Sequence, residues 1–218
     1  MLAMGIDYKL DIVMCIDATK SMSYFLRNFG ESAITFYQKY VEEMEINGIE
    51  YSQLRIKVVV FRDFYSKEPL AESRFFVMEK EADAFYDYVK NIQSEGGAFG
   101  KACALEALSL ALKSDWVKDG QKRRHIVVVF SDSKPYALGE KSDSPLYPEG
   151  IPSSFEELTK VWDEMDGKSK RLIVMAPECE PWADKMVEWV NCFYSPVEGN
   201  NGLNGEDLET CVKLLAHL

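Results

Sequence analysis

The sequence is poor in the residues that zinc sites and histidine-based catalysis use. Its 218 residues include only two histidines, and its five cysteines are widely spaced with no CxxC pair. An odd number of scattered cysteines argues against a disulfide framework, so we expect free thiols in a reducing, cytoplasmic compartment. His125 opens an expected strand and His217 is the penultimate residue, so neither is placed to act as a general base.

Long apolar runs and an excess of basic residues are also missing. No run approaches the ~20 apolar residues of a membrane-spanning helix. The first residues carry Asp7 in place of a basic region, so we expect no signal peptide. Lys and Arg number 25 against 36 Asp and Glu, a net charge of −11. Because such a surface repels phosphate backbones and anionic lipid, we expect neither nucleic acid nor membrane as a partner.

The chain does contain an alternation of strand and helix patterns. Four apolar runs without alternation are typical of strands covered on both faces: residues 10–16, 56–61, 126–130 and 172–176. A further strand is expected at 191–197 and a short edge strand at 75–78. Helices are expected over residues 25–44 (ending at Asn47 and Gly48), 80–92, 100–114, 154–166, 181–189 and 206–217.

This alternation predicts an α/β fold with a doubly wound, mostly parallel six-stranded sheet. The strand at 75–78 should be antiparallel at one edge, and helices should cover both faces. The length fits one domain over residues 1–218, since domains usually hold roughly 100–200 residues. Residues 134–152 form a long loop with four of the eight prolines, which is either functional or a tolerated surface insertion.

Candidate ligands follow the buried strands directly. Asp17, Thr19 and Ser21 come after the first strand at spacings of two residues, and Asp132 follows the strand at 126–130. In open α/β sheets ligands bind beyond the carboxyl ends of the strands, so these side chains should share one crevice. Carboxylate and hydroxyl oxygens suit a hard cation such as Mg²⁺. Thr19 and Ser21 would equally serve as caps of the next helix.

At these residues the sequence resembles the von Willebrand factor type A (vWA) domain over nearly the whole chain. The resemblance rests on DIVMCIDATKSM, VVVFRDF, GGAFGKACALEAL and HIVVVFSDSKP. The DATKSM and FRD variants are most similar to intracellular members. The resemblance implies a Rossmann-like vWA fold and a protein-interaction module rather than an enzyme.

The resemblance also implies a variant metal-ion-dependent adhesion site. Asp17, Thr19, Ser21 and Asp132 match the family's metal ligands, and an acidic group of a protein partner would complete the shell of Mg²⁺, Mn²⁺ or Ca²⁺. Ala98 stands where the family has a threonine, so we expect weak metal binding.

Two other functions remain open from the sequence. One is a metal-dependent, phosphoesterase-like hydrolase that uses Asp17 as nucleophile or ligand. The other is a vWA scaffold that has lost its metal, which Ala98 favours. The sequence identifies neither the partner nor the oligomeric state.

Overall fold

Side chains of the central strand β1 (Tyr8–Asp17) alternate between two separate hydrophobic clusters in the computed structural model, which describes residues 6–97, 99–197, 203 and 205–217. Ile12 and Met14 enter one cluster, whereas Val13 and Cys15 enter the other. All four side chains are fully buried. The apolar run therefore lacks polar alternation because both faces of the sheet are covered.

The sheet has the order β3-β2-β1-β6-β8-β9, with β4 also paired to β2. Its other strands are β2 (Gln53–Phe61), β3 (Leu70–Glu72), β4 (Phe76–Val77), β6 (Lys122–Phe130), β8 (Lys170–Ala176) and β9 (Cys192–Pro196). All pairings are parallel except those of β3 and β4, which are both antiparallel to β2. The predicted fold class is confirmed. The antiparallel edge is divided between two short strands, so the sheet has seven strands rather than six.

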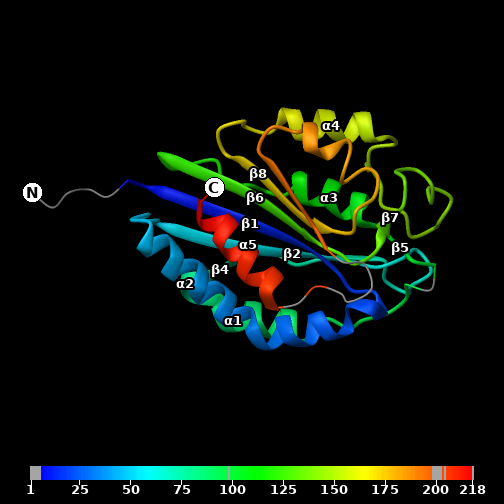
Figure 1. Ribbon diagram of the computed structural model, residues 1–218. Coiled ribbons are helices and arrows are strands. Elements are labelled where there is room, and N and C mark those ends of the chain that lie inside the picture. Colours follow the sequence, from blue (N-terminus) through cyan, green and yellow to red (C-terminus); the bar gives the residue numbers. More distant parts are fainter. Residues whose placement is uncertain (1–5, 98, 198–202, 204, 218) are drawn as a thin grey trace, which may run out of the picture.

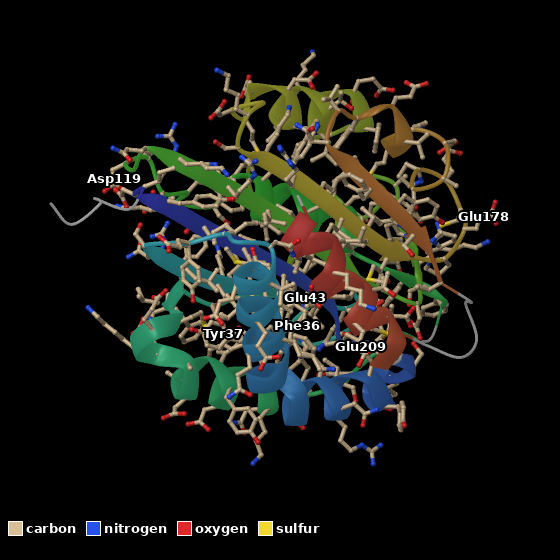
Figure 2. The ribbon with its side chains drawn as sticks, turned by 60° about the vertical axis from the view of Figure 1, so that its left-hand side comes forward. Phe36, Tyr37, Glu43, Asp119, Glu178 and Glu209 are labelled. Carbon is tan, nitrogen blue, oxygen red and sulfur yellow. The ribbon has the colours of Figure 1, made fainter. Side chains whose placement is uncertain are left out.

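Helices cover both faces of the sheet (Figure 1). One layer contains α1 (Ser23–Ile46), α2 (Met78–Lys90) and α5 (Gly205–His217), and the other contains α3 (Ala104–Leu112) and α4 (Phe155–Glu164). Within the first layer α5 lies beside α1, where Lys39 and Glu209 form an ion pair at 2.7 Å (Figure 2). Phe36 of α1 is buried beneath that surface.

Two parts of the predicted secondary structure differ from the observed one. The helix expected at residues 181–189 is wrong: this segment consists of turns and one 3₁₀ helix, Met186–Glu188. Trp182, Met186 and Trp189 are buried at helix-like spacing, but such a short segment gains little from helix propagation. The start of the expected helix at 100–114 is instead a short strand, β5 (Lys101–Ala102), which pairs with β7 (Lys134–Pro135).

The carboxyl ends of the parallel strands meet at one edge of the sheet. Asp119, which precedes β6, and Glu178, which follows β8, lie at opposite ends of the molecule in Figure 2. The loops that follow β1, β2 and β6 all lie at the Glu178 end, where β5 and β7 are labelled in Figure 1. Residues that are far apart in the sequence are therefore brought together at this edge.

Candidate functional site

Asp17, the last residue of β1, has a fully buried carboxylate that three hydrogen bonds hold in place. The Thr19 amide and hydroxyl donate to Oδ1 at 2.8 and 2.7 Å, and the Ser131 hydroxyl donates to Oδ2 at 2.6 Å. Ser131 directly follows β6, the neighbour of β1 in the sheet. Both Asp17 oxygens are thus fixed by residues from the two adjacent strand ends.

A continuous chain of polar contacts joins Asp17 to the second predicted carboxylate. Thr19 Oγ1 lies 3.1 Å from Ser21 Oγ, and Ser21 Oγ donates to Asp132 Oδ1 at 2.9 Å. The Ser133 hydroxyl also donates to Asp132, at 3.1 Å. The structure therefore brings Asp17, Thr19, Ser21 and Asp132 together in one cluster.

The cluster has fewer hydroxyl protons than oxygen–oxygen contacts. Three oxygen–oxygen contacts, at 2.7, 3.1 and 2.9 Å, run from Asp17 through Thr19 and Ser21 to Asp132. Each hydroxyl carries one proton and an ionised carboxylate carries none, so only two protons are present. When both hydroxyls donate to their carboxylates, the 3.1 Å contact between Thr19 and Ser21 has no proton, and protonation of Asp17 or a cation between the oxygens would make it favourable.

Burial also works against the charge on Asp17. Desolvation raises the pKa of Asp17 to about 6, although the hydrogen bonds from Ser131 and Thr19 oppose the rise. The nearby charge of Asp132 adds to the increase. A bound cation would offset the repulsion between the two carboxylates and the cost of burying one of them.

The loop after α2 approaches the cluster closely and is held by a third buried carboxylate. Asp63 accepts hydrogen bonds from the Gly97 amide at 2.7 Å and the Ser66 hydroxyl at 2.7 Å. A Cβ atom on Gly97 would lie 2.8 Å from Cβ of Thr19, and Gly97 has a φ of +85°. Glycine is therefore required here both for conformation and for space.

Two acidic residues near the glycine loop, Asp63 and Glu95, could in principle supply the oxygen that Ala98 lacks, but neither reaches the cluster in the described contacts. Asp63 holds the glycine loop, and Glu95 accepts from the Lys67 amide at 3.3 Å. Ala98 itself lies outside the described residues. The predicted effect of Ala98 on metal affinity stays a prediction.

The donor set of the cluster fits a hard cation with an incomplete protein shell. All candidate ligand atoms are carboxylate or hydroxyl oxygens, which Mg²⁺ prefers. Among residues 6–97, 99–197, 203 and 205–217, no group of three or more His, Cys, Asp or Glu side chains is placed to hold a metal. A cation here would depend on Asp17, Asp132, the two hydroxyls and water.

Sequence reasoning missed the role of Ser131 and of Asp63. Ser131 directly follows a buried strand, and this position was the available signal for its part in the site. The signal for Asp63 was the same, but its partner Gly97 is 34 residues away. Nothing local in the sequence indicates that pairing.

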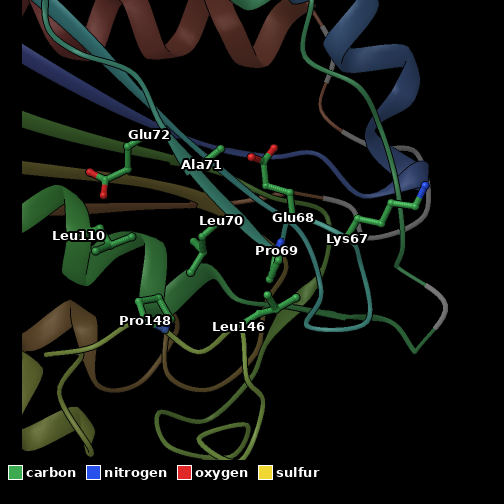
Figure 3. A pocket seen from close by; sticks show the side chains of 9 residues that line it. All are labelled: Lys67, Glu68, Pro69, Leu70, Ala71, Glu72, Leu110, Leu146 and Pro148. Carbon is green, nitrogen blue, oxygen red and sulfur yellow. The ribbon is translucent and has the colours of Figure 1, made fainter.

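The proline-rich loop at 134–152 packs beside this region. Leu146 and Pro148 of the loop lie opposite Leu70 of β3, and Leu110 of α3 completes the wall of a shallow pocket of ≈ 360 Å³ (Figure 3). Pro69 lies at its centre in this view. The loop therefore packs against α3 and the sheet edge.

No protein-family model and no curated protein matches the sequence. In the part of the chain that the structure describes, every helix is too short or too polar to cross a membrane.

Solved structures do match the fold. The pilus adhesin SpaC from Lactobacillus rhamnosus GG is 10% identical with a TM-score of 0.58, over 96% of this chain and 30% of that chain. A von Willebrand factor type A protein from Catenulispora acidiphila is 13% identical with a TM-score of 0.50, over 96% and 42%. Proximal thread matrix protein 1 from the mussel byssus is 14% identical with a TM-score of 0.51, over 97% and 48%.

The chain thus spans less than half the length of each of these three solved chains. At such low identity the likeness concerns the fold alone. The mostly parallel sheet with helices on both faces agrees with it. The chain has the mixed α/β fold of a von Willebrand factor type A domain.

Proposed function

We propose that the chain is a protein-interaction module that binds a divalent cation at the cluster of Asp17, Thr19, Ser21 and Asp132. The cation, when bound, supplies a positive charge with open positions for an acidic group of the partner. Asp17 and Asp132 provide the negative charge, and the hydroxyls of Thr19 and Ser21 provide neutral oxygens. Mg²⁺ suits the proposal because it keeps several waters when protein ligands are few.

The observation that carries the proposal is that the contacts from Asp17 to Asp132 have one proton fewer than they need to be hydrogen bonds throughout. Three contacts share two hydroxyl protons, and the distance between Thr19 Oγ1 and Ser21 Oγ is 3.1 Å. A cation that accepts lone pairs from both hydroxyls would remove this conflict. Because Asp17 is fully buried, its charge is compensated by the three hydrogen bonds that it accepts and, in this proposal, by the cation.

The compartment proposed for this function is the cytoplasm. All five cysteines are free, and Cys15, Cys103 and Cys211 are buried. Free thiols are typical of proteins kept in a reducing environment.

The hydrolase alternative in which Asp17 is the nucleophile has less support. A nucleophilic Asp17 must contact a substrate, but its side chain is fully buried and both oxygens already accept hydrogen bonds. Incubation with phosphoesters and Mg²⁺ tests this alternative directly, since turnover that Asp17→Asn abolishes would favour the hydrolase.

Titration calorimetry with MgCl₂ and MnCl₂ tests the metal. We expect binding to the parent protein, loss of binding in Asp17→Asn, and no change in the control Asp163→Asn on α4. A ligand at a hundredfold excess over Kd stabilises the fold by roughly 2.7 kcal/mol, so melting temperature gives a second readout. If neither cation binds, the scaffold without metal replaces this proposal. A pull-down compared in Mg²⁺ and in EDTA tests whether binding of a protein partner depends on the cation.

A further inference from the structure

Two large aromatic side chains are exposed on the loops that follow β2 and α2, and the loop after α2 contacts Thr19 of the candidate metal site. Tyr65 is 64% exposed and Phe99 is 67% exposed, and their ring centroids are 4.8 Å apart. Single exposed apolar residues are common on protein surfaces, but here two rings contact each other while both remain open to water. Tyrosine is also enriched among the residues that dominate binding energy at interfaces.

The same carboxylate that holds the glycine loop fixes this aromatic pair. Asp63 Oδ1 accepts from the Tyr65 amide at 3.2 Å, and Asp63 Oδ2 accepts from the Gly97 amide at 2.7 Å. Phe99 follows Gly97 by two residues. Gly97 in turn packs against Thr19 of the candidate metal site, as the close approach of its missing Cβ shows.

These links give the aromatic pair a defined position relative to the metal cluster. The Lys20 amide reaches the Gly96 carbonyl at 3.4 Å, and the Glu95 amide donates to the Ala18 carbonyl at 2.8 Å. The loop that carries Phe99 is therefore bonded on both sides of Thr19. A surface organised before binding loses less conformational entropy when a partner docks.

A positive charge lies next to the pair. The Lys141 ammonium is 3.3 Å from the Tyr65 hydroxyl and 5.3 Å from the centre of the Tyr65 ring. The chain as a whole carries a net charge of −11, and Glu140 and Asp143 lie near Lys141, so its ammonium offers an acidic partner a local attraction on an otherwise acidic surface.

We propose that Tyr65 and Phe99 form the apolar half of a docking surface whose other half is the metal cluster. The occupant is an acidic segment of a protein partner in which an aromatic or long aliphatic side chain neighbours the carboxylate that reaches the cation. The inference rests on the proposed function for its carboxylate half, whereas the aromatic half stands on its own contacts. The surface selects partners by the residue beside the acid.

Three short peptides test this surface: acetyl-Gly-Gly-Glu-Phe-Gly-Gly-amide and its versions with Glu-Ala and Gln-Phe at the centre. Binding is measured by NMR titration in Mg²⁺ and in EDTA. We expect the Glu-Phe peptide to bind about five- to tenfold more tightly than the Glu-Ala peptide, the range for one buried aromatic contact. Glu-Phe should also exceed Gln-Phe in Mg²⁺ but not in EDTA.

Variants assign the effect to the aromatic pair. The double substitution Tyr65→Ala and Phe99→Ala should remove the difference between Glu-Phe and Glu-Ala, whereas Tyr65→Phe should keep it. The control Ile46→Ala removes an exposed apolar side chain at the far end of α1, a 24-residue helix about 36 Å long. This control should leave all affinities unchanged.

The peptide experiment can overturn the aromatic half of the surface and the metal half independently. If Glu-Phe and Glu-Ala bind equally in Mg²⁺ and both exceed Gln-Phe, the aromatic inference is overturned and the metal proposal stands. If the preference for Phe persists without any effect of Mg²⁺, the metal proposal fails and the aromatic surface stands. Failure of all three peptides to bind the parent protein overturns the docking surface, whereas the calorimetry decides cation binding independently.

Discussion

Asp17 and Glu106 are both fully buried carboxyl groups, yet their surroundings are opposite. Asp17 accepts three hydrogen bonds at 2.6–2.8 Å. Among the described residues, none donates a hydrogen bond of ordinary length to either side-chain oxygen of Glu106, on α3. The backbone amide of Glu106 and then the Tyr147 hydroxyl lie near enough to lower the pKa of Glu106, although neither makes a hydrogen bond of ordinary length.

Asp17 is surrounded by hydrogen-bond donors that stabilise a negative charge, whereas Glu106 is buried with fewer of them. Desolvation raises the pKa of both groups, of Glu106 to about 7 and of Asp17 to about 6, so the pKa alone does not distinguish them. Donors around Asp17 and a nearby second carboxylate are the arrangement that a cation requires. Glu106 lies on α3, under the loop that contributes Tyr147, and belongs to the core rather than to the site.

The largest expected effect comes from Glu106→Gln. Because the pKa of Glu106 in the fold is about 7 against a usual value of 4.5, its stabilising contribution is complete below pH 4.5 and is lost as pH rises through 7. The variant avoids this loss. Urea unfolding at pH 8 should therefore show a gain on the order of 3 kcal/mol over the parent.

A second pH and an exposed control variant test this prediction. At pH 4.5 its advantage should fall below about 1 kcal/mol, since the parent is then protonated in the fold. Glu164→Gln on the exposed side of α4 should show no such pH dependence. A gain in Glu106→Gln that is equal at both pH values would mean that the carboxyl is not desolvated.

A second prediction concerns the approach of the glycine loop to Asp17. Gly97→Ala adds a side chain at a φ of +85° and places Cβ 2.8 Å from Cβ of Thr19. We expect a loss of more than about 2 kcal/mol of unfolding free energy. Gly100→Ala has a similar φ of +66° but nothing within 4 Å, so it should lose only about 1 kcal/mol. Equal losses would show that the contact with Thr19 has no energetic weight.

Removing one donor should make Asp17 more similar to Glu106. Ser131→Ala deletes the hydrogen bond to Asp17 Oδ2, and bonds to charged groups contribute about 1.5–3 kcal/mol. We expect a loss near the lower end of that range at pH 8 and a smaller loss at pH 5, where Asp17 is more often protonated. Ser133→Ala, which touches Asp132 instead, serves as the control. A loss that does not depend on pH would contradict the prediction.

The smallest effect is expected from restoring the oxygen that the resemblance places at residue 98. Ala98→Thr should tighten Mg²⁺ or Mn²⁺ binding, and a tenfold gain corresponds to about 1.4 kcal/mol at saturating metal. The measurement is the metal-dependent rise in melting temperature against each protein's own EDTA baseline. An identical rise in both proteins would show that residue 98 does not contribute to the metal shell.

Much of the fold could be predicted from local patterns. Runs of buried residues located β1, β2, β6 and β8, and apolar residues at three- and four-residue spacing located α1. These signals are local because a strand or helix covered by others must be apolar on the covered faces. The edge strand β3 has only three partly exposed residues and carried no such signal.

The helix expected at 181–189 shows how the same signal misleads. Trp182, Met186 and Trp189 are spaced as on a helix face and are buried, yet turns place them in the core. Periodicity reports which side chains are buried, and it does not by itself report the backbone that buries them.

The sequence by itself determined the layered α/β fold and the two strand ends where Asp17 and Asp132 lie. Only the tertiary structure decided which donors meet them. Ser131 is 114 residues from Asp17, and Gly97 is 34 residues from Asp63. Such contacts depend on strand order and register, which place β1 beside β6 and β2 and bring the loops to one edge. The hydrogen bonds that distinguish Asp17 from Glu106 therefore exist only after the sheet has formed.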